Sequence, residues 1–309
     1  MTRVVLVGAG EVGSKHMAAL GSRPGTHLVA VADPAPHADV APGVPRFLRW
    51  QDALARNPDL VVVATPPGIA LRVARAAARN GARVLVEKPV VISPAELRPV
   101  QEEDARIFVA FQPHFAPGLP ALLAASPAVR RIDVSLSCRR DRPYFRTWRT
   151  SYATAGGVLH QQAIHGLALA LRLLPDTPIV ASRAQVIHVR QWSETEDRVS
   201  AQLALEGGEL LTITARVDAD NGAPHHHVVV HCADGRRLTV RGRNLHAGLG
   251  EPADAPGDLE LRHALYDAVL ADQPQHPALF PLPLLHRTLE VIDRVYRSAH
   301  VVRLAPAAA

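Results

Sequence analysis

The sequence has little cysteine, few aromatic residues and almost no lysine. Of its 309 residues, 2 are cysteine and 4% are aromatic. Cys138 and Cys232 are too few for a disulfide scaffold, and their spacing does not fit a zinc site. No apolar run reaches the ~20 residues of a membrane span, and Met1 to Gly10 predict a strand and a turn rather than a secretion signal. We therefore expect a protein of the reducing cytoplasm without a membrane partner.

The positive charge of the chain comes almost entirely from arginine. Lysine and arginine together number 34 against 29 acidic residues, which gives a net charge of +5, and only Lys15 and Lys88 are lysines. The excess is scattered along the chain rather than striped, so we expect no nucleic-acid partner. A primary amine can serve as a proton donor with a tunable pKa where arginine cannot. Each of the two lysines is therefore a candidate for chemistry.

Residues 1–113 alternate short β-branched runs with helical patterns, which predicts an α/β domain with a doubly wound parallel sheet. The expected strands are Arg3 to Val7, Leu28 to Ala32, Leu60 to Ala64, Val84 to Glu87 and Ile107 to Phe111. The expected helices are Gly13 to Leu20, Gln51 to Arg56, Gly68 to Asn80 and Pro94 to Glu103. Gly81 is placed to end the third helix.

Residues 114–309 are expected to form a second domain, of the α+β class, with a large and mainly antiparallel open sheet. From Arg131 the apolar pattern has a period of two, and the expected strands are Arg131 to Arg139, Ile179 to Val189, Arg198 to Leu205, Glu209 to Val217, His226 to Cys232 and Arg237 to Val240. The inward face is expected to carry Val134, Leu136, Val199, Leu203, Leu205, Leu211, Ile213, Val228 and Val230. The opposite face is small and polar, with Ser135, Ser137, Ser200, Gln202, Thr212 and Thr214.

Two helices and two irregular segments complete this second half. The helices are expected at Gly157 to Leu174 and at Leu284 to Ala299, the latter with one apolar stripe. Gly242 to Asp258 is expected to be a loop, and Ala305 to Ala309 is expected to fray. The small polar face of the sheet is suited to contact with a second copy of the chain, which predicts a homodimer or homotetramer.

A glycine-rich turn, Gly8-Ala9-Gly10-Glu11-Val12-Gly13, follows the first strand and opens the first helix. The first glycine allows a tight turn, the second lets a pyrophosphate approach the positive end of the helix, and the third lets helix and strand pack closely. Asp33 ends the next strand, where its carboxylate accepts hydrogen bonds from ribose hydroxyls and repels a 2′-phosphate. Pro34-Ala35-Pro36 offers no arginine to bind that phosphate. The turn therefore predicts a dinucleotide site that favours NAD(H) and leaves NADP(H) open.

Two further motifs stand at the carboxyl ends of predicted strands in the same sheet. Ala64-Thr65-Pro66-Pro67 ends the third strand and Glu87-Lys88-Pro89 ends the fourth, at the edge where open parallel sheets bind ligands. Each motif is also an ordinary strand exit, because proline is common there. Lys88 favours the functional interpretation, since one of only two lysines lies at the mouth of the expected cofactor crevice.

The helix that begins at Gly156-Gly157 carries no Asp, Glu, Lys or Arg before Arg172, which predicts that it is largely buried. Gln161 and His165 are four residues apart, so they share one face near the start of this helix. A core histidine bonded to the backbone and a functional histidine both fit this pattern.

Two clusters admit a structural interpretation at least as readily as a functional one. Alternate residues of His225-His226-His227 would point to opposite faces of a strand, so we expect no metal site there. The run from Arg139 to Arg149 interleaves arginines with aromatic residues, among them Tyr144. It is a solvated loop, or it clamps an anionic or sugar substrate or RNA.

Taken together, these motifs resemble those of the Gfo/Idh/MocA family of NAD(P)-dependent oxidoreductases over nearly the whole chain. The matching pieces, in order, are Gly8 to Gly13 with His16, Ala64 to Pro67, Glu87 to Pro89, Phe115 to Pro117, Trp148-Arg149 and Gly156 to His165. The resemblance implies a Rossmann domain, a second α/β domain whose open sheet forms oligomer contacts, and oxidation or reduction of an oxygen-bearing carbon on a sugar, nucleotide sugar or cyclitol.

The resemblance also implies roles for individual residues. Lys88 is the site lysine, and His165 is the histidine that helps with proton transfer. From the residues themselves we expect Gln161, Tyr144 and Arg149 to orient hydroxyls or an anionic group of the substrate. The expected cofactor contacts are Gly8, Gly10, Glu11, Val12, Gly13, Asp33, Ala64, Thr65, Pro66, Pro67, Glu87 and Lys88.

The chain departs from the family pattern at three positions. Family members often carry Asp or Asn where Gln161 stands, a histidine where Ala70 stands, and a glycine where Ala155 stands. An amide can hydrogen-bond a hydroxyl but cannot take its proton. Reduction of an imine on the same scaffold therefore stays open beside alcohol and ketone chemistry, and so does a non-catalytic dinucleotide-binding sensor.

Overall fold

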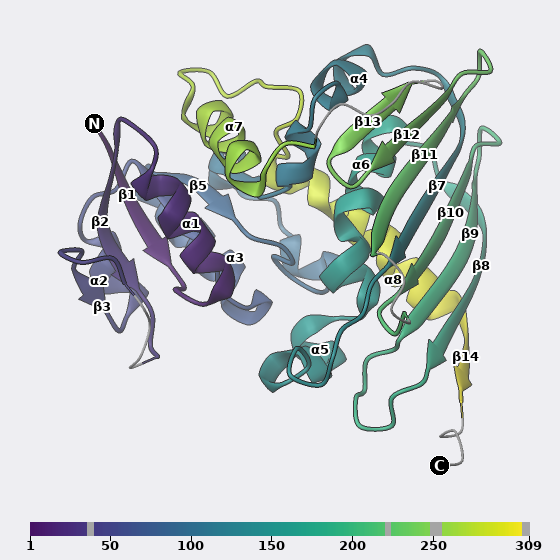
Figure 1. The fold of residues 1–309 in the computed structure, drawn as a ribbon, viewed down its shortest axis with the longest axis horizontal. Helices are drawn as coiled ribbons and strands as arrows, with labels where there is room; N and C mark the ends of the chain where they lie inside the picture. Colours follow the sequence, from purple (N-terminus) through teal and green to yellow (C-terminus); the bar gives the residue numbers. More distant parts are fainter. Residues whose placement is uncertain (36–39, 220–223, 248–254, 305–309) are drawn as a thin grey trace. The chain divides into compact units, whose positions relative to one another are not determined.

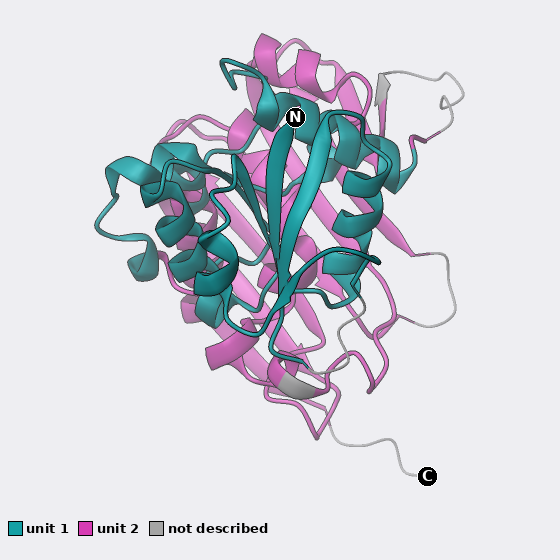
Figure 2. Ribbon diagram, turned by 90° about the vertical axis from the view of Figure 1, so that its left-hand side faces the viewer, with its two compact units in different colours: residues 1–91, 95–115, 257–285 teal, residues 92–94, 116–256, 286–309 magenta. Residues whose placement is uncertain are grey.

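The computed structural model describes residues 1–35, 40–219, 224–247 and 255–304 (Figure 1). These residues form two compact units (Figure 2). Unit 1 comprises residues 1–91, 95–115 and 257–285, and unit 2 comprises residues 92–94, 116–256 and 286–309. None of the described helices is long and apolar enough to cross a membrane.

Unit 1 contains a six-stranded sheet in the order β3-β2-β1-β4-β5-β6 (Figure 1). All of its strand pairs are parallel. The strands are β1 (Thr2–Val7), β2 (Thr26–Ala32), β3 (Arg46–Phe47), β4 (Leu60–Val63), β5 (Arg83–Val86) and β6 (Ile107–Val109). The predicted parallel sheet and five of its strands are therefore confirmed. The two-residue strand β3 lacks the apolar run that marks the others.

The central strands of unit 1 are buried on both faces. Val4, Val5 and Leu6 of β1 have no exposed surface, and neither does any residue of β4. Figure 2 shows helices on either side of this sheet, which explains why its strands consist of continuous apolar runs rather than alternating ones. Each such side chain contributes roughly 1.5–3 kcal/mol of burial free energy.

The helices of unit 1 connect these strands and cover the sheet. They are α1 (Glu11–Gly21), α2 (Trp50–Leu54), α3 (Pro67–Arg79) and α7 (Asp258–Leu270), with 3₁₀ turns at Pro94–Leu97, Glu102–Arg106, Gln112–Phe115 and Leu282–Leu284. As predicted, Gly81 follows the end of α3, where it adopts a φ of 89°. The predicted helix over Pro94 to Glu103 is wrong. Pro99 lacks an N–H and restricts Arg98, so the segment forms two short turns instead.

The segment 257–285 belongs to unit 1, although the predicted division at residues 113 and 114 assigns it to the second domain. Its helix α7 was not predicted, and it packs against α1, β5 and the turn at Gln112–Phe115. The side chains of Leu261, Leu265 and Val269 are buried there. The sequence of a helix does not predict which unit the helix packs against, because that depends on contacts between segments far apart in the chain.

Unit 2 contains an eight-stranded sheet in the order β13-β12-β11-β7-β10-β9-β8-β14 (Figure 1). The strands are β7 (Val129–Ser137), β8 (Ile179–His188), β9 (Arg198–Leu205), β10 (Leu210–Arg216), β11 (His225–Cys232), β12 (Arg237–Arg241), β13 (Asn244–Ala247) and β14 (Ala299–Arg303). The prediction of a mainly antiparallel sheet is confirmed. Two pairs, β7 with β10 and β8 with β14, are parallel.

Two strands of unit 2 were not predicted. β13 lies inside the predicted loop Gly242 to Asp258, of which residues 248–254 lie outside the described part of the chain. β14 directly follows the last helix. The predicted fraying of Ala305 to Ala309 also concerns residues outside the described part.

The two faces of this sheet differ as the period of two predicts. All nine residues expected on the inward face are buried. On the opposite face Ser200, Gln202 and Thr214 are exposed, while Ser135, Ser137 and Thr212 are half-buried. One face of the sheet is therefore apolar and covered within unit 2, and the other is small and polar.

The helices of unit 2 are α4 (Leu119–Ala125), α5 (Tyr152–Ala155), α6 (Ile164–Leu173) and α8 (Leu285–Ser298), with a 3₁₀ turn at Thr147–Thr150 and a π-helical turn at Leu159–Ala163. Helix α6 lies against β7 and β11. A Cβ added at Gly166 would come within 3.1 Å of both Val134 and Val228, so this glycine allows helix and sheet to approach closely. The predicted apolar stripe of α8 is present, with Leu285, Leu289, Ile292 and Val295 buried.

Candidate active site

The glycine-rich turn joins β1 to α1 in unit 1, and its three glycines meet different surroundings. Gly8 has a φ of 95°, and a Cβ there would lie 2.4 Å from the carbonyl oxygen of Ala64. A Cβ at Gly13 would lie 2.1 Å from the carbonyl oxygen of Gly8. In contrast, a Cβ at Gly10 would meet nothing within 4 Å. Gly8 and Gly13 are thus required by the packing of the protein itself, whereas Gly10 faces open space at the start of α1.

Asp33 follows β2, and its carboxylate is fixed by two backbone groups. Oδ2 accepts a hydrogen bond of 2.7 Å from the N–H of Ala9, and Oδ1 accepts one of 2.7 Å from the N–H of Ala35. Sequence analysis found no arginine beside Asp33, but the structure places Arg46 of β3 there. Its Nη2 lies 3.3 Å from the carbonyl oxygen of Asp33 and also contacts that of Ala35. Arg46 reaches this place because β3 pairs in parallel with β2, and the sequence gives no indication of that pairing.

The motif Ala64-Thr65-Pro66-Pro67 connects β4 to α3. Pro66 stands just before the helix and Pro67 is its first residue, a position where the missing N–H costs nothing. The Thr65 hydroxyl is a buried oxygen with no hydrogen-bond partner in the described structure. An unpaired buried hydroxyl together with the open space at Gly10 fits a bound polar ligand such as the phosphates and ribose of a dinucleotide.

Lys88 is half-buried and is the second residue after β5, and Glu87 between them is buried. The Glu87 carboxylate faces groups of unit 1. Its Oε1 lies 3.0 Å from Nε2 of His16, 3.0 Å from Nε2 of Gln112 and 3.3 Å from Nη1 of Arg262. Burial alone would raise the pKa of Glu87, but the hydrogen bond from His16 and the positive charges around the carboxylate lower this pKa to about 2.

In unit 2, Gly156-Gly157 begins the helical segment that carries Gln161 and His165. Gly156 has a φ of 60°, which favours glycine. A Cβ at Gly157 would lie 2.2 Å from the hydroxyl of Tyr296, so no larger residue fits there. The amide Nε2 of Gln161 donates a hydrogen bond of 2.9 Å to the carbonyl oxygen of Gly156. Gln161 is buried and His165 is half-buried, which confirms that the segment is largely covered.

A buried carboxylate that sequence analysis missed holds the start of this segment. Glu196 has no exposed surface, and its oxygens accept hydrogen bonds of 2.5 Å from the hydroxyls of Tyr152 and Tyr296 and of 2.7 Å from the N–H of Val158. Burial, followed by the nearby negative charge of Glu196, raises the pKa of both tyrosines. The only sequence signal was an acidic pair, Glu196-Asp197, preceding a predicted strand, a pattern that exposed turns share.

Tyr144 and Arg149 belong to a cluster of arginine and aromatic side chains in unit 2. The guanidinium carbons of Arg140 and Arg149 lie 4.9 and 4.7 Å from the centre of the Tyr144 ring. Gln162 links this cluster to the segment of Gln161, because its Nε2 lies 2.5 Å from the Tyr144 hydroxyl and its Oε1 accepts a bond of 2.9 Å from Arg140. Neither arginine forms an ion pair with a carboxylate of the described residues.

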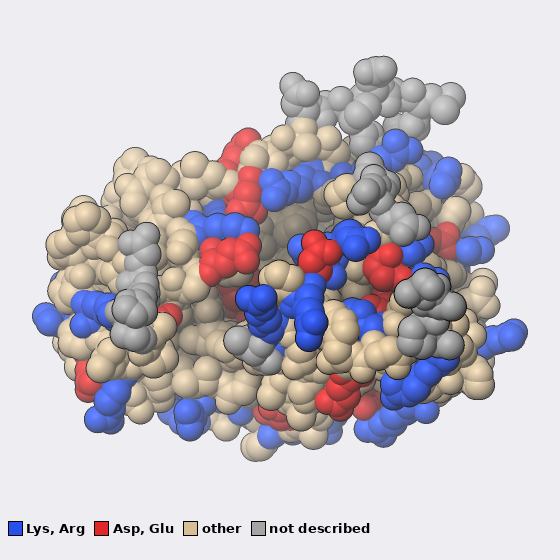
Figure 3. All heavy atoms as spheres, turned by 60° about the horizontal axis from the view of Figure 1, so that its bottom comes forward, with Lys and Arg blue, Asp and Glu red and all other residues tan. Residues whose placement is uncertain are grey.

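The remaining charges do not form a single patch. Figure 3 shows basic side chains interspersed with acidic ones over one face of the molecule. The rings of His225 and His227 stack 4.9 Å apart, as expected for alternate residues of a strand. Within the described ranges no three His, Cys, Asp or Glu residues gather in a way that could hold a metal ion.

The structure thus brings the predicted cofactor residues together in unit 1 and the predicted substrate residues together in unit 2. The turn after β1, Asp33, Ala64 to Pro67 and Lys88 all stand at the carboxyl ends of adjacent parallel strands. Gln161, Tyr144 and Arg149 are joined through Gln162 and the turn at Gly156.

Some known proteins are similar to this chain in sequence, and others are similar to it in fold. An inositol 2-dehydrogenase of Rhizobium meliloti (strain 1021) is 27% identical over 213 residues, which cover 66% of this chain and 64% of that protein. The match therefore spans less than two thirds of that relative. The WlbA dehydrogenase of Bordetella pertussis, solved with NADH and UDP-GlcNAcA, has a TM-score of 0.77 at 23% identity over 96% of both chains. GenD2 from gentamicin A biosynthesis, solved with NAD, has a TM-score of 0.76 at 21% identity over 96% of this chain and 93% of its own.

Family matches cover both halves of the chain. Residues 2–111 match the oxidoreductase family with an NAD-binding Rossmann fold, GFO_IDH_MocA, and residues 128–237 match the C-terminal domain of that family. The two matches follow one another in the order that the motifs predict. The protein therefore belongs to the Gfo/Idh/MocA family of oxidoreductases and contains an NAD-binding Rossmann domain.

Proposed function

We propose that this protein is an NAD(H)-dependent oxidoreductase that acts on a secondary alcohol or ketone carbon of a sugar, nucleotide sugar or cyclitol. The observation that carries the proposal is the place of Lys88. It follows β5, which pairs with β4, and β4 pairs with β1, so the lysine shares one sheet edge with Ala64 and the glycine-rich turn. Ligands of open parallel sheets bind at this edge.

The chain offers a set of groups that fits NAD(H). The N–H groups at the start of α1 carry the positive end of the helix dipole, and Gly10 leaves space for a pyrophosphate beside them. Asp33 is the acceptor for ribose hydroxyls, and its fixed negative charge disfavours a 2′-phosphate. The bound nicotinamide supplies the acceptor or donor of the hydride.

Lys88 and His165 divide the work on the reacting oxygen. The Lys88 ammonium donates a hydrogen bond to this oxygen and stabilises the negative charge that develops as the carbonyl forms or is reduced. An imidazole exchanges protons near neutral pH, so His165 accepts or returns the hydroxyl proton. Gln161, Tyr144 and Arg149 orient the remaining hydroxyls or an anionic group of the substrate.

The structure leads us to assign Glu87 and Gln161 roles that differ from, or narrow, those expected from the sequence. The carboxylate of Glu87 is already bonded to three groups of the protein, so we assign it to holding the end of β5 rather than to touching the cofactor. The amide nitrogen of Gln161 donates to the carbonyl oxygen of Gly156, and we assign the amide oxygen as the acceptor for a substrate hydroxyl.

We extend the proposal to the setting of the protein. The two cysteines, Cys138 and Cys232, are both free thiols, which supports a reducing compartment such as the cytoplasm. The small polar face of the unit 2 sheet supports a homodimer or homotetramer. We propose a small molecule as the substrate, whether the protein is a dimer or a tetramer.

Replacing Lys88 tests the proposal. We expect Lys88→Ala to leave the Kd for NADH nearly unchanged and to lower kcat on the correct substrate by at least ~10², the effect of losing one charge-stabilising donor. Lys88→Arg is expected not to restore activity, because a guanidinium is larger and cedes no proton near neutral pH. Lys15→Ala is the matched control, since this second lysine is exposed and pairs with Glu11, at 3.5 Å.

The same assay separates the alternatives. A panel of cyclitols, nucleotide sugars and imines, followed by NADH absorbance, reports which class is turned over. Tight NADH binding without turnover of any of them would favour the dinucleotide sensor. His165→Ala is expected to lower kcat to a similar extent as Lys88→Ala and to flatten one limb of the pH-rate profile. Normal turnover by Lys88→Ala would refute the assignment of the lysine.

A further inference from the structure

A closed group of polar side chains lies in unit 1 behind the Glu87-Lys88 motif, and the proposed mechanism does not use it. It consists of His16 from α1, Glu87 from the end of β5, Gln112, and Arg262 and Tyr266 from α7; we call it the Arg262 cluster. His16 and Tyr266 have no exposed surface, and the other three are 5% to 7% exposed. Buried charges of this kind are rare unless they are paired.

The hydrogen bonds of the Arg262 cluster connect three distant parts of the sequence. The Tyr266 hydroxyl lies 2.6 Å from Nδ1 of His16, and Nε2 of His16 lies 3.0 Å from Oε1 of Glu87. Arg262 approaches the same oxygen to 3.3 Å through Nη1, and its Nε donates a bond of 2.9 Å to Asp258. Nε2 of His16 also lies 3.0 Å from Nη1 of Arg262, so this ring nitrogen faces both the carboxylate and the guanidinium.

The positive charge of Arg262 lies beside the negative charge of Glu87 in this cluster. Burial lowers the pKa of His16, so the imidazole is neutral near pH 7 and adds no charge. Burial raises the pKa of Tyr266, so its hydroxyl stays protonated. The permanent charges that remain are the negative one of Glu87 and the positive one of Arg262, with Asp258 on the outer side of the guanidinium.

The charges of Glu87 and Arg262 both act on the Lys88 ammonium, because Lys88 is the next residue after Glu87. The Lys88 ammonium is among the positive charges that lower the pKa of Glu87, and the interaction is mutual. A negative Glu87 alone would stabilise the ammonium form of Lys88. Arg262 offsets that effect, since its positively charged Nη1 lies 3.3 Å from Oε1 of the same carboxylate. In the native protein the two effects oppose each other.

We propose that Arg262 is a positioning residue for Lys88, because it fixes the Glu87 carboxylate and its positive charge offsets the effect of this carboxylate on the ammonium. The inference rests on the proposed function only in the sense that Lys88 is the reacting lysine. The return of residues 257–285 to unit 1 places Arg262 of α7 beside the Glu87 carboxylate. Because Arg262 is buried and paired with Glu87 and Asp258, we assign it no contact with the substrate or the cofactor.

The proposal makes two predictions of opposite sign. Glu87→Gln keeps the shape of the side chain and removes the negative charge, so the titration midpoint of Lys88 is expected to fall by about half a pH unit or more. Arg262→Met removes the positive charge and keeps the aliphatic stem, so the midpoint is expected to rise by a similar amount. The double variant Glu87→Gln/Arg262→Met is expected to lie between the two.

The scarcity of lysine makes this titration directly observable. Lysine labelled with ¹³C at Cε gives two signals in the full chain, and the Lys15→Arg background leaves that of Lys88 alone. The measurement needs neither substrate nor turnover, so its outcome is independent of whether the proposed reaction is correct. Asp104→Asn is the control, because it disrupts an equally buried ion pair of unit 1, with Arg75 at 2.8 Å, without touching the Arg262 cluster.

Shifts of opposite sign for Glu87→Gln and Arg262→Met, with none for Asp104→Asn, support the proposal. A general loosening of unit 1 would move both variants in one direction, and that result would overturn it, as would unchanged midpoints in both. Should Arg262→Met fail to fold, comparing Glu87→Gln with the double variant decides. The midpoint must then rise when Arg262 is removed from the Glu87→Gln background, and its failure to rise contradicts the role of Arg262.

Discussion

Oδ2 of Asp33 accepts a hydrogen bond from the N–H of Ala9 at 2.7 Å, so the carboxylate at the end of β2 is tied to the glycine-rich turn after β1. A group fixed in this way cannot easily turn away from a 2′-phosphate. The position of Asp33 therefore sets both the shape of the turn and the expected preference for NAD(H) over NADP(H).

This relationship predicts the effect of an Asp33 variant. We expect the wild-type protein to bind NADH at least ~10 times more tightly than NADPH, because repulsion of the 2′-phosphate by a carboxylate costs on the order of 1 kcal/mol or more. In Asp33→Ser the repulsion is absent and Arg46 lies nearby, so NADPH binding is expected to improve. Dissociation constants from fluorescence titration measure this, with Asp33→Ser/Arg46→Ala as the control. Tighter NADPH binding by the wild-type protein would contradict the preference.

The glycines of the turn predict two different phenotypes. Gly10→Ala adds a methyl group where nothing lies within 4 Å, so the protein is expected to fold normally and to bind NADH more weakly. Gly13→Ala places a methyl group 2.1 Å from the carbonyl oxygen of Gly8, so it is expected to lower the thermal unfolding midpoint. Thermal unfolding and NADH titration of both variants separate binding from packing. Equal destabilisation by the two substitutions would show that Gly10 is structural as well.

The sequence was sufficient for the parallel sheet of unit 1 and for the apolar face of the unit 2 sheet. In both, a local repeat of side chains follows directly from burial: continuous for β4, alternating for β9 and β10. The edge strands β3, β13 and β14 carry no such repeat, since an edge strand is held mainly by one neighbour. The partner of β14 is also distant in sequence, since Ala299 pairs with Ala184.

The site residues also fall into those that local sequence predicts and those that it does not. Gly8, Gly13 and Asp33 stand at fixed offsets from a strand and a helix, so their positions could be predicted from local sequence. Arg46, Glu196 and Arg262 could not, because each reaches its partner through the tertiary fold and none lies in a local motif. Glu196 and Arg262 are both buried, although sequence patterns would place such charged side chains on the surface.

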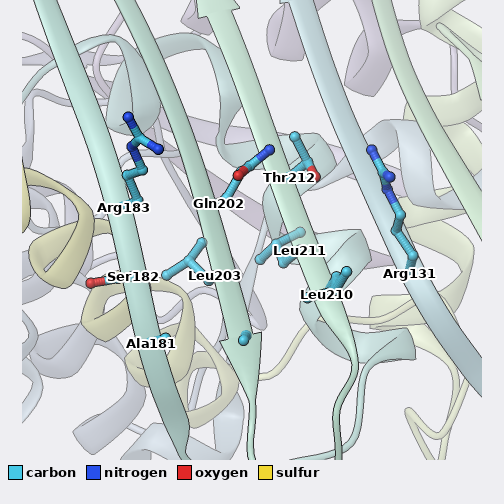
Figure 4. Close-up of a pocket in the computed structure, with 10 residues that line it drawn as sticks. Arg131, Ala181, Ser182, Arg183, Gln202, Leu203, Leu210, Leu211 and Thr212 are labelled. Carbon is cyan, nitrogen blue, oxygen red and sulfur yellow. The ribbon is translucent and has the colours of Figure 1, made fainter.

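The polar face of the unit 2 sheet predicts self-association. The face carries a hollow of about 320 Å³ lined by Arg131, Arg183, Gln202 and Thr212 among others (Figure 4). The serine and threonine side chains that dominate this face leave an open surface that another copy of the sheet can approach closely. Multi-angle light scattering is expected to show a dimer or tetramer of the 33.2 kDa chain.

A charge placed on this face tests where the copies meet. Thr214 is exposed on β10, and Thr214→Lys would bring like charges together in a symmetric contact and is expected to shift the mass toward the monomer. Glu206→Gln, on an exposed turn of the same unit, changes the charge by the same +1 outside the face and serves as a control. A monomeric wild-type protein at micromolar concentrations would refute self-association.

The low pKa of Glu87 predicts how unit 1 responds to acid. The pKa of this carboxyl is about 2, below its ordinary value of 4.5, so the folded state binds this proton less readily than the unfolded state does. The resulting stabilisation is fully present above pH 4.5 and is lost as the pH falls toward 2; by linkage it amounts to about 3 kcal/mol. His16 acts in the same direction from a higher pH, because its pKa is lowered from 6.5 and the buried neutral ring must gain a proton on unfolding in acid.

Urea unfolding at a series of pH values measures this dependence. The unfolding free energy of the wild-type protein is expected to fall steeply between about pH 5 and pH 2, and Glu87→Gln is expected to have a lower stability at pH 7 with a flatter slope in this window. Glu260→Gln, on the exposed part of α7, controls for the loss of one negative charge from the same unit. If Glu87→Gln kept the full acid slope, the ion pair with Arg262 would contribute nothing to the acid response, because the neutral amide cannot take up the proton that the carboxylate takes up on unfolding.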